Sequence, residues 1–322
     1  MVSDKKIALM GLDNAGKTSI LTTMRKKFDI SEEIKGIKPT LKVERSNFQF
    51  LNHIIYSADY GGQKKYLDEY LAHKTRYLSS IDLLFFVVDI QDSLRFQESI
   101  DFLKEILDYF EEIDNKSPIV ILYHKTDPKL REDPTILHNQ EQYTELLQPF
   151  LEKHPMHFYN TSTYDIATIL HAFSKGILFL YDQTTAIQKI IDDFVEKIEN
   201  VMALLIFEQN GIELGSYFLE HITLQMKKKI LTLYEISQRR ILEENLNTYE
   251  FSDRLDTFTK VSGTIQSFEI EGVKFFILLI LEEHDEEMVV SQFNYFENAH
   301  DELQAILRAI LLDEYEDQQL NP

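Results

Sequence analysis

The 322-residue chain contains no cysteine and no tryptophan. The lack of cysteine excludes a disulfide framework, thiolate zinc sites and lipid anchors attached through cysteine. Long apolar runs are also missing: the longest, residues 81–90 and 273–281, have the length of strands, whereas a membrane helix needs ~20 residues. We therefore expect a cytoplasmic protein that does not insert directly into membranes and that would need a partner to be recruited to one.

Basic side chains are few relative to acidic ones. Lys and Arg number 33 against 54 Asp and Glu, for a net charge of −21. This surplus of negative charge argues against a nucleic-acid partner, because cations are needed to neutralise phosphates. Apolar residues make up 44% and aromatic residues 12% of the chain, which is typical of a globular rather than a disordered protein.

The deficit of positive charge is uneven along the chain. Residues 1–180 carry 22 basic and 26 acidic side chains, a net of −4, whereas residues 181–322 carry 11 and 28, a net of −17. The change in composition coincides with a change in hydrophobic pattern. At about 150 residues per domain, the sequence predicts two domains, residues 1–182 and 183–322.

Short apolar segments alternate with helical patterns in the first half. Strands are expected at residues 7–10, 43–50, 54–59, 82–89, 119–124 and 157–161, and helices at 17–28, 94–110, 143–151 and 166–180. Strands that alternate with helices in this way predict an α/β fold with a doubly wound parallel sheet. Ligands of such sheets bind in the crevice at the carboxyl ends of the strands.

The second half has a different pattern. Helices are expected at residues 186–199, 224–247 and 301–312, and strands at 202–207, 215–219 and 273–281. An apolar segment at 258–270 is expected to form two short strands, broken near Gly263. The order α-β-β-α-β-β-β-α predicts an α+β domain with an antiparallel sheet.

The segment Gly11–Thr18 (GLDNAGKT) fits the motif G-x-x-x-x-G-K-[ST] and lies between an expected strand and an expected helix. In such a loop the glycines let backbone N–H groups point at a phosphate, the lysine reaches the β- and γ-phosphates, and the hydroxyl ligates Mg²⁺. The alternative is a chance strand–turn–helix, but the context favours nucleotide binding. The predicted binding residues of this loop are Gly11, Asp13, Asn14, Ala15, Gly16, Lys17, Thr18 and Ser19, with Thr18 as a metal ligand.

The sequence His124-Lys125-Thr126-Asp127 follows an expected buried strand. A carboxylate at Asp127 can accept two hydrogen bonds from the N1–H and 2-amino groups of guanine, and adenine offers no such pair. The alkyl stem of Lys125 can cover the face of the base. Alone, this string is more typical of a charged surface loop; after the phosphate loop, it predicts guanine recognition.

A third segment, Asp59-Tyr60-Gly61-Gly62-Gln63, ends another expected strand. Asp59 can hold Mg²⁺ through water, Gly62 can offer its N–H to a γ-phosphate, and Gln63 can orient an attacking water. Thr40 lies in a polar loop that could cover the nucleotide and is a candidate second Mg²⁺ ligand. The alternatives are a Gly-Gly turn and a solvated loop threonine.

In this order and at these distances, the segments resemble the small GTPases. The phosphate loop GLDNAGKTS is similar to the Arf branch, whereas residues 40–46 leading into 59–63, and His124 where most small GTPases carry Asn, are similar to the Rag branch. The stretch Thr161-Ser162-Thr163-Tyr164-Asp165 matches too. The resemblance implies GTP and GDP as ligands, Mg²⁺ as cofactor, and a nucleotide contact by His124, Thr161, Ser162 and Thr163. It also implies Gln63, Lys17 and Thr40 as the catalytic residues.

Rag proteins also carry a C-terminal roadblock domain, which is related to longin domains, and the order of elements in the second half is similar to it. The resemblance implies dimerisation through a helix and an adjacent strand edge. The expected helix carries one apolar stripe made of Ile230, Leu231, Tyr234, Ile241 and Leu242, of which Ile230, Tyr234 and Ile241 are the candidate contact residues. The alternative is that this stripe packs on its own sheet. The expected partner is a Rag-like paralogue or a separate roadblock-domain protein, because the acidic domain would repel its own copy. A homodimer stays open.

The leading hypothesis is therefore a guanine-nucleotide switch with slow hydrolysis. An exchange factor and a GTPase-activating protein would be its regulatory partners, and two segments, at about 30–42 and 60–78, would respond to the γ-phosphate. One alternative is a scaffold that holds nucleotide without useful turnover. The other is a P-loop ATPase or kinase, against which Asp127 and the absence of a recognisable motif for a second substrate both argue.

Overall fold

The computed structural model describes residues 5–27, 43–50, 53–181, 184–209, 211–283 and 303–308. The chain divides into two compact units, Met1–Leu180 and Tyr181–Pro322, here called the first and second unit. Thr40 lies outside the described residues. In the described part of the chain, no helix combines the length and apolar character needed to cross a membrane.

The first unit contains a six-stranded sheet in the order β2-β3-β1-β4-β5-β6. Five strands run parallel, and β2 pairs antiparallel with β3 at one edge. The strands are β1 (Lys5–Met10), β2 (Val43–Phe50), β3 (His53–Tyr60), β4 (Leu83–Asp89), β5 (Ile119–His124) and β6 (Met156–Thr161). This arrangement confirms the predicted α/β class.

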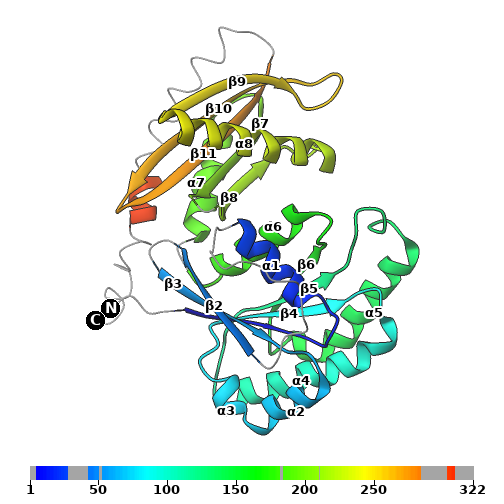
Figure 1. Cartoon of the computed structure of the whole chain (residues 1–322). Helices are drawn as coiled ribbons and strands as arrows, with labels where there is room; N and C mark the ends of the chain where they lie inside the picture. Colours follow the sequence, from blue (N-terminus) through cyan, green and yellow to red (C-terminus); the bar gives the residue numbers. More distant parts are fainter. Residues whose placement is uncertain are drawn as a thin grey trace. The chain divides into compact units, whose positions relative to one another are not determined.

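Helices cover both faces of this sheet. Figure 1 shows α1 and α6 on one face and α2 to α5 on the other. The helices are α1 (Lys17–Lys27), α2 (Lys64–Ala72), α3 (Lys74–Tyr77), α4 (Phe96–Glu112), α5 (Pro134–Leu151) and α6 (Ile166–Leu178), and a short 3₁₀ turn, η1 (Ser93–Arg95), precedes α4. Because β4 and β5 are enclosed by helices on both sides, their residues are buried almost throughout, as their continuous apolar runs predict.

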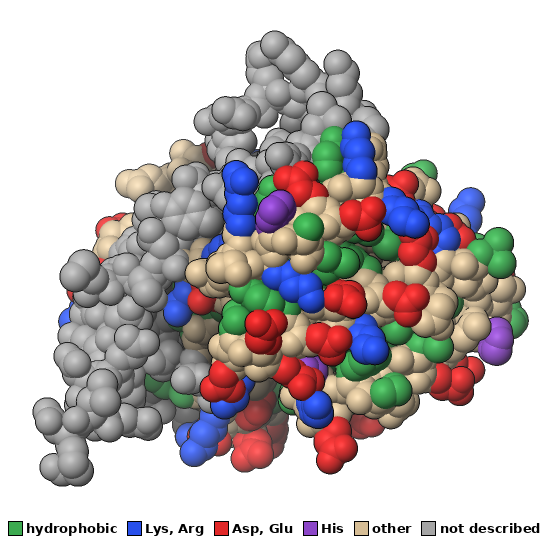
Figure 2. All heavy atoms as spheres, turned by 90° about the horizontal axis from the view of Figure 1, so that it is seen from below, with side chains coloured by type: hydrophobic (Ala, Val, Ile, Leu, Met, Phe, Trp, Pro, Cys, Tyr) green, Lys and Arg blue, Asp and Glu red, His purple; other side chains and the backbone are tan. Residues whose placement is uncertain are grey.

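Acidic and basic side chains are mixed on the outer surface of these helices. Figure 2 views the chain from below and shows Asp and Glu interspersed with Lys and Arg over the described part of that face. Lys74 on α3 pairs with Glu105 on α4 at 2.9 Å, and Lys153 pairs with Glu111 at 3.0 Å. Exposed pairs of this kind contribute little to stability, so we interpret this face as a solvated surface.

The second unit contains a five-stranded antiparallel sheet in the order β8-β7-β11-β10-β9. Its elements are α7 (Thr184–Val195), β7 (Val201–Glu208), β8 (Glu213–Phe218), α8 (Leu224–Glu244), β9 (Thr248–Arg254), β10 (Lys260–Ile270) and β11 (Val273–Glu282). Residues 303–308 are also helical. The sheet confirms the predicted α+β class and is consistent with a roadblock-like domain.

The predicted break at Gly263 does not occur. The strand β10 runs unbroken through this glycine, and the additional strand is β9, which was not predicted. Phe251 of β9 is directly opposite Gly263, and a Cβ placed on Gly263 would lie only 2.2 Å from the Cζ atom of Phe251. The aromatic ring thus covers the glycine and provides the cross-strand contact that the missing side chain cannot.

The three residues of the apolar stripe that were predicted to contact a partner lie in the core of the second unit. Ile230, Tyr234 and Ile241 are at most 3% exposed and belong to the core of the second unit. The ring of Tyr234 stacks on Phe207 of β7 at a centroid distance of 4.0 Å. The helix α8 therefore directs this stripe toward its own sheet, which corrects the assignment of these three side chains to a partner contact.

Candidate functional site

A cavity of about 650 Å³ opens among the loops at the carboxyl ends of the first unit's strands. This volume is within the usual range for small-molecule sites. The cavity is lined by Asp13, Asn14, Gly16, Lys17, Thr18, Ser19, Gly61, Gly62, Gln63, Gln91, His124, Lys125, Asp127, Thr163 and Tyr164. Segments that are up to about 150 residues apart, as Asp13 and Thr163 are, therefore meet at one place. Of the predicted nucleotide contacts, Gly11, Ala15, Thr161 and Ser162 are not part of this lining.

The phosphate loop connects β1 to α1. The backbone is left-handed at Asn14 (φ 59°), and Gly16 has φ 99°, a conformation that residues with a Cβ rarely adopt. The Nζ atom of Lys17 donates to the carbonyl oxygens of Gly11 (2.9 Å) and Leu12 (2.7 Å), which holds the ammonium group over the loop. Because α1 begins at Lys17, the positive end of its dipole is directed at the cavity and favours an anion there.

The side chain of His124 packs against Gly16 of the phosphate loop. The side chain is 2% exposed, and its Nδ1 lies 3.0 Å from Oγ1 of Thr161 on β6. A Cβ on Gly16 would lie 2.3 Å from the imidazole Cδ2, so only glycine fits between the loop and this ring. Burial, together with the nearby charge of Lys125, lowers the pKa of His124 to about 4. The imidazole is therefore neutral near pH 7.

Asp127 is held by the hydroxyl of Ser162, the residue that follows β6. Its Oδ1 accepts a hydrogen bond from the Ser162 hydroxyl at 2.6 Å, and that same oxygen of Ser162 accepts one from the Tyr164 N–H at 3.1 Å. Lys125 is left-handed (φ 64°), and its Nζ pairs with Asp89 at 2.6 Å. These contacts fix the carboxylate and the lysine stem at one end of the cavity.

Two residues around this end were missed from the sequence. Gln91 lines the cavity and donates from Nε2 to the Lys125 carbonyl at 2.7 Å. Its position two residues after β4 is a signal, because carboxyl ends of parallel strands build such sites. Arg131 pairs with Asp165 at 2.6 Å and ties the loop after Asp127 to the start of α6. No sequence pattern connects Arg131 with Asp165.

The segment at 60–63 contacts the phosphate loop at the other end of the cavity. The Asp13 N–H donates to the Gly62 carbonyl at 2.9 Å, and a Cβ on Gly62 would lie 2.2 Å from that same nitrogen. Gln63 lines the cavity at the N-cap of α2. The Tyr60 hydroxyl donates to the Tyr77 carbonyl at 2.6 Å and anchors the segment to α3.

Two of the predicted Mg²⁺ ligands belong to segments beside the phosphate loop. Thr18 lines the cavity at the start of α1. The backbone of Asp59 pairs with Leu9 of β1, next to the phosphate loop, but its side chain, like the whole of Thr40, lies outside what the structure describes. A hydroxyl and a carboxylate beside a phosphate cradle are oxygen donors of the kind Mg²⁺ uses, so these residues fit the ion.

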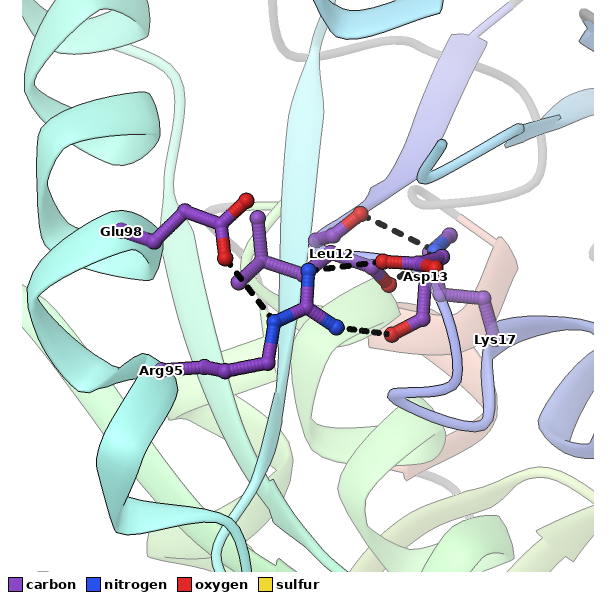
Figure 3. Close-up of polar contacts among 6 residues, drawn as sticks. Leu12, Asp13, Lys17, Arg95 and Glu98 are labelled. Atoms are coloured by element: carbon purple, nitrogen blue, oxygen red, sulfur yellow. Dashed lines mark hydrogen bonds and ion pairs between the residues drawn. The ribbon is translucent and has the colours of Figure 1, made fainter. Parts of the chain in front are cut away.

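Arg95 was also missed, and it contacts the phosphate loop directly. From η1, its Nη2 donates to Asp13 Oδ1 at 2.7 Å, and its Nη1 donates to the Asp13 carbonyl at 3.2 Å (Figure 3). Its Nε donates to Glu98 of α4 at 2.9 Å. The two partners are 82 positions apart in sequence, so no local pattern reveals the contact.

The sequence is similar to one family model and to several curated proteins. Residues 6–265 match the family model described as Gtr1/RagA G protein conserved region. The chain is 35% identical over 123 residues to ADP-ribosylation factor-like protein 3 of Caenorhabditis elegans, covering 38% of this chain and 61% of that protein. It is 32% identical over 124 residues to ADP-ribosylation factor-like protein 6 of the same species, covering 38% and 62%. The chain thus spans about three-fifths of the length of the curated relatives it matches.

Among solved structures, the chain is similar to the Arl6 BBS3 small GTPase from Trypanosoma brucei with the bound nucleotide analogue GppNp. The TM-score is 0.45 at 21% identity, and the similarity covers 55% of this chain and 98% of that one. The family model spans well over half of the chain, including the phosphate loop, the segment at 60–63 and most of the second unit. The chain therefore belongs to the Gtr1/RagA G protein family.

Proposed function

We propose that this chain is a guanine-nucleotide switch that binds GTP and GDP with Mg²⁺, hydrolyses GTP slowly and is accelerated by a partner. The single observation that carries the proposal is the cavity at the sheet's carboxyl edge. It brings the phosphate loop, Gln63 and Asp127 together around a volume suited to a nucleotide. Family membership supports GTP binding and hydrolysis in general.

Each end of the cavity suits one part of the nucleotide. Asp127, held by the Ser162 hydroxyl, can accept from the guanine N1–H and 2-amino groups, and the stem of Lys125 can cover the base. The loop amides and Lys17 would stabilise negative charge on the phosphates. Thr18, Asp59 and Thr40 would hold Mg²⁺, which supplies neutralisation of the β- and γ-phosphate oxygens when bound.

Gln63 would orient the water that attacks the γ-phosphate. Among the described residues that line the cavity there is no arginine, whereas an arginine is worth roughly 10³–10⁵ in rate where a small GTPase has one. We therefore expect intrinsic hydrolysis on the order of 10⁻⁴ s⁻¹, and an activating protein that supplies an arginine to the γ-phosphate.

The test is nucleotide binding and single-turnover hydrolysis by the full chain. A labelled nucleotide is needed as the probe, because the chain has no tryptophan. GDP should displace it and ADP should not. Equal competition by ADP would favour the ATPase or kinase alternative, and tight GTP binding with no detectable turnover would favour the scaffold.

Replacing Gln63 with alanine is expected to slow single-turnover GTP hydrolysis roughly tenfold, because the attacking water loses its orientation. Affinity for GDP should not change, since Gln63 lies at the phosphate end of the cavity. The matched control is Lys64→Ala, which alters the exposed neighbour at the start of α2. Equal rates for the wild-type chain and Gln63→Ala would show that this residue does not orient the water.

We also propose that the second unit dimerises through the outer surface of α8 and the edge of β9. Leu224, Ile236 and Leu242 of α8 are each about half exposed. The strand β9 is the last in its sheet, and α8 packs over β9 and β10. With a net charge of −17 over residues 181–322, a less acidic paralogue or a separate roadblock-domain protein is the favoured partner.

Replacing Ile236 and Leu242 with aspartate is expected to weaken this association about tenfold or more, because each change buries a charge in an apolar contact. The measurement is sedimentation of the full chain with the partner that co-purifies with it. Leu137→Asp, at an exposed apolar position on α5 of the first unit, is the matched control. Unchanged association of the double variant would exclude the outer surface of α8 as the interface.

A further inference from the structure

The guanidinium of Arg95 lies between two carboxylates, one of them on the phosphate loop. Figure 3 shows it directed at Asp13 on one side and Glu98 on the other. It contacts the Asp13 carboxylate at 2.7 Å and the Asp13 carbonyl at 3.2 Å, and donates to Glu98 at 2.9 Å. Two contacts with a single loop residue fix both the backbone and the side chain of Asp13.

Asp13 lies at the end of the cavity where the terminal phosphate of a triphosphate would be. Its N–H donates to the Gly62 carbonyl at 2.9 Å, and the next residue, Gln63, lines the cavity. On its other side, the Leu12 carbonyl accepts from Lys17, the lysine that reaches β- and γ-phosphates. The base end, with Asp127, is built from the loops that follow β5 and β6.

A carboxylate at this end would oppose a triphosphate more than a diphosphate. Like charges repel with an energy that rises as their distance falls, and GTP places additional negative charge close to Asp13. Arg95 counters this effect in two ways: its positive charge, shared with Glu98, offsets part of the charge of the Asp13 carboxylate, and the ion pair holds that carboxylate against η1. The side chains of Arg95 and Asp13 are 32% and 48% exposed, so solvent and salt reduce the effect to a modest size.

We propose that Arg95 is a positioning residue that holds the Asp13 carboxylate away from the γ-phosphate and thereby sets the preference of this chain for GTP over GDP. The proposal rests on the guanine-nucleotide function above and goes beyond it. It differs from a purely structural role, in which Arg95 braces the loop against α4. A brace would change stability and the affinities for both nucleotides together, whereas a charge-positioning residue changes their ratio.

The test measures the dissociation constants of GDP and of a non-hydrolysable GTP analogue for the full chain at low salt. In Arg95→Ala, the ratio of analogue affinity to GDP affinity is expected to fall about fivefold. Adding Asp13→Asn to the same chain removes the unpaired charge and should return the ratio to the wild-type value. At about 1 M salt, where the Debye length is ~3 Å, the difference between Arg95→Ala and the wild type should largely disappear.

Two variants keep the test decisive. Lys116→Ala removes an exposed cation that pairs with Asp114, so it changes the net charge equally and should leave the ratio unchanged. Arg95→Gln retains a donor for the Asp13 carbonyl without the charge, and it replaces Arg95→Ala if that variant does not fold. An unchanged ratio in both Arg95 variants, or a lowered ratio that Asp13→Asn does not restore, would overturn the proposal. A wild-type chain that binds neither nucleotide would instead overturn the proposed function.

Discussion

Replacing Asp127 with asparagine is expected to lower the affinity for GDP more than a hundredfold and to transfer the preference to xanthine nucleotides. The carboxylate can accept two hydrogen bonds from guanine. Asparagine has one acceptor and presents its NH₂ group to the guanine 2-amino group, which is also a donor. Losing one hydrogen bond to a charged acceptor and leaving two donors facing each other without a partner costs about 3–6 kcal/mol in total. Xanthine carries an oxygen at position 2, which accepts from that same NH₂ group.

The contacts around Asp127 allow this replacement without loss of the local structure. Its Oδ1 accepts from the Ser162 hydroxyl, and an asparagine carbonyl at this position can accept the same bond, so the fold around the residue should persist. The measurement is competition of GDP, XDP and ADP against a labelled nucleotide. Asp133→Asn is the matched control: it makes the same chemical change six positions away, at the N-cap of α5, where asparagine caps equally well. Undiminished GDP affinity in Asp127→Asn would refute guanine recognition by this carboxylate.

The first unit was largely predictable because its signals are local. Buried parallel strands require continuous apolar runs, and β4 and β5 have them. The phosphate loop could be found for a similar reason: the residues that shape it are consecutive, and its left-handed positions need specific residue types. The early start of α5 was missed although its signal is also local. Asp133 caps the helix, and Pro134 occupies its first position.

Features that depend on distant residues could not be read from the sequence. Gly263 is a strand breaker by propensity, and only Phe251, on the neighbouring strand, overrides that tendency. The apolar stripe of α8 would look the same whether it faced a partner or its own sheet; the structure places Ile230 in the core. The contact of Arg95 with Asp13 is of the same kind, because it depends on how η1 approaches the phosphate loop.

Acidification is expected to destabilise the first unit through His124. Burial and the charge of Lys125 lower the pKa of this imidazole to about 4, against an ordinary value of ~6.5. Between these pH values the unfolded chain takes up a proton that the folded chain does not, so each pH unit below ~6.5 costs up to 1.36 kcal/mol. The contribution is absent above that range and amounts to about 3 kcal/mol once the pH reaches ~4.

Replacing His124 with asparagine removes the titrating group, and the amide can retain a hydrogen bond to Thr161. The variant should therefore lose less stability than the wild-type chain between pH 6.5 and 4.5, measured by thermal unfolding followed by circular dichroism. Carboxylates whose pKa is lowered, such as Glu111 with its partners Lys153 and His154, also lose stability in acid, but they do so equally in both chains. His138→Asn, an exposed position on α5, should follow the wild-type profile. Parallel pH profiles for the wild type and His124→Asn would mean that the imidazole is protonated in place, beside Gly16 and the phosphate loop. In that case His124 would add a positive charge to the nucleotide site rather than a neutral support beneath it.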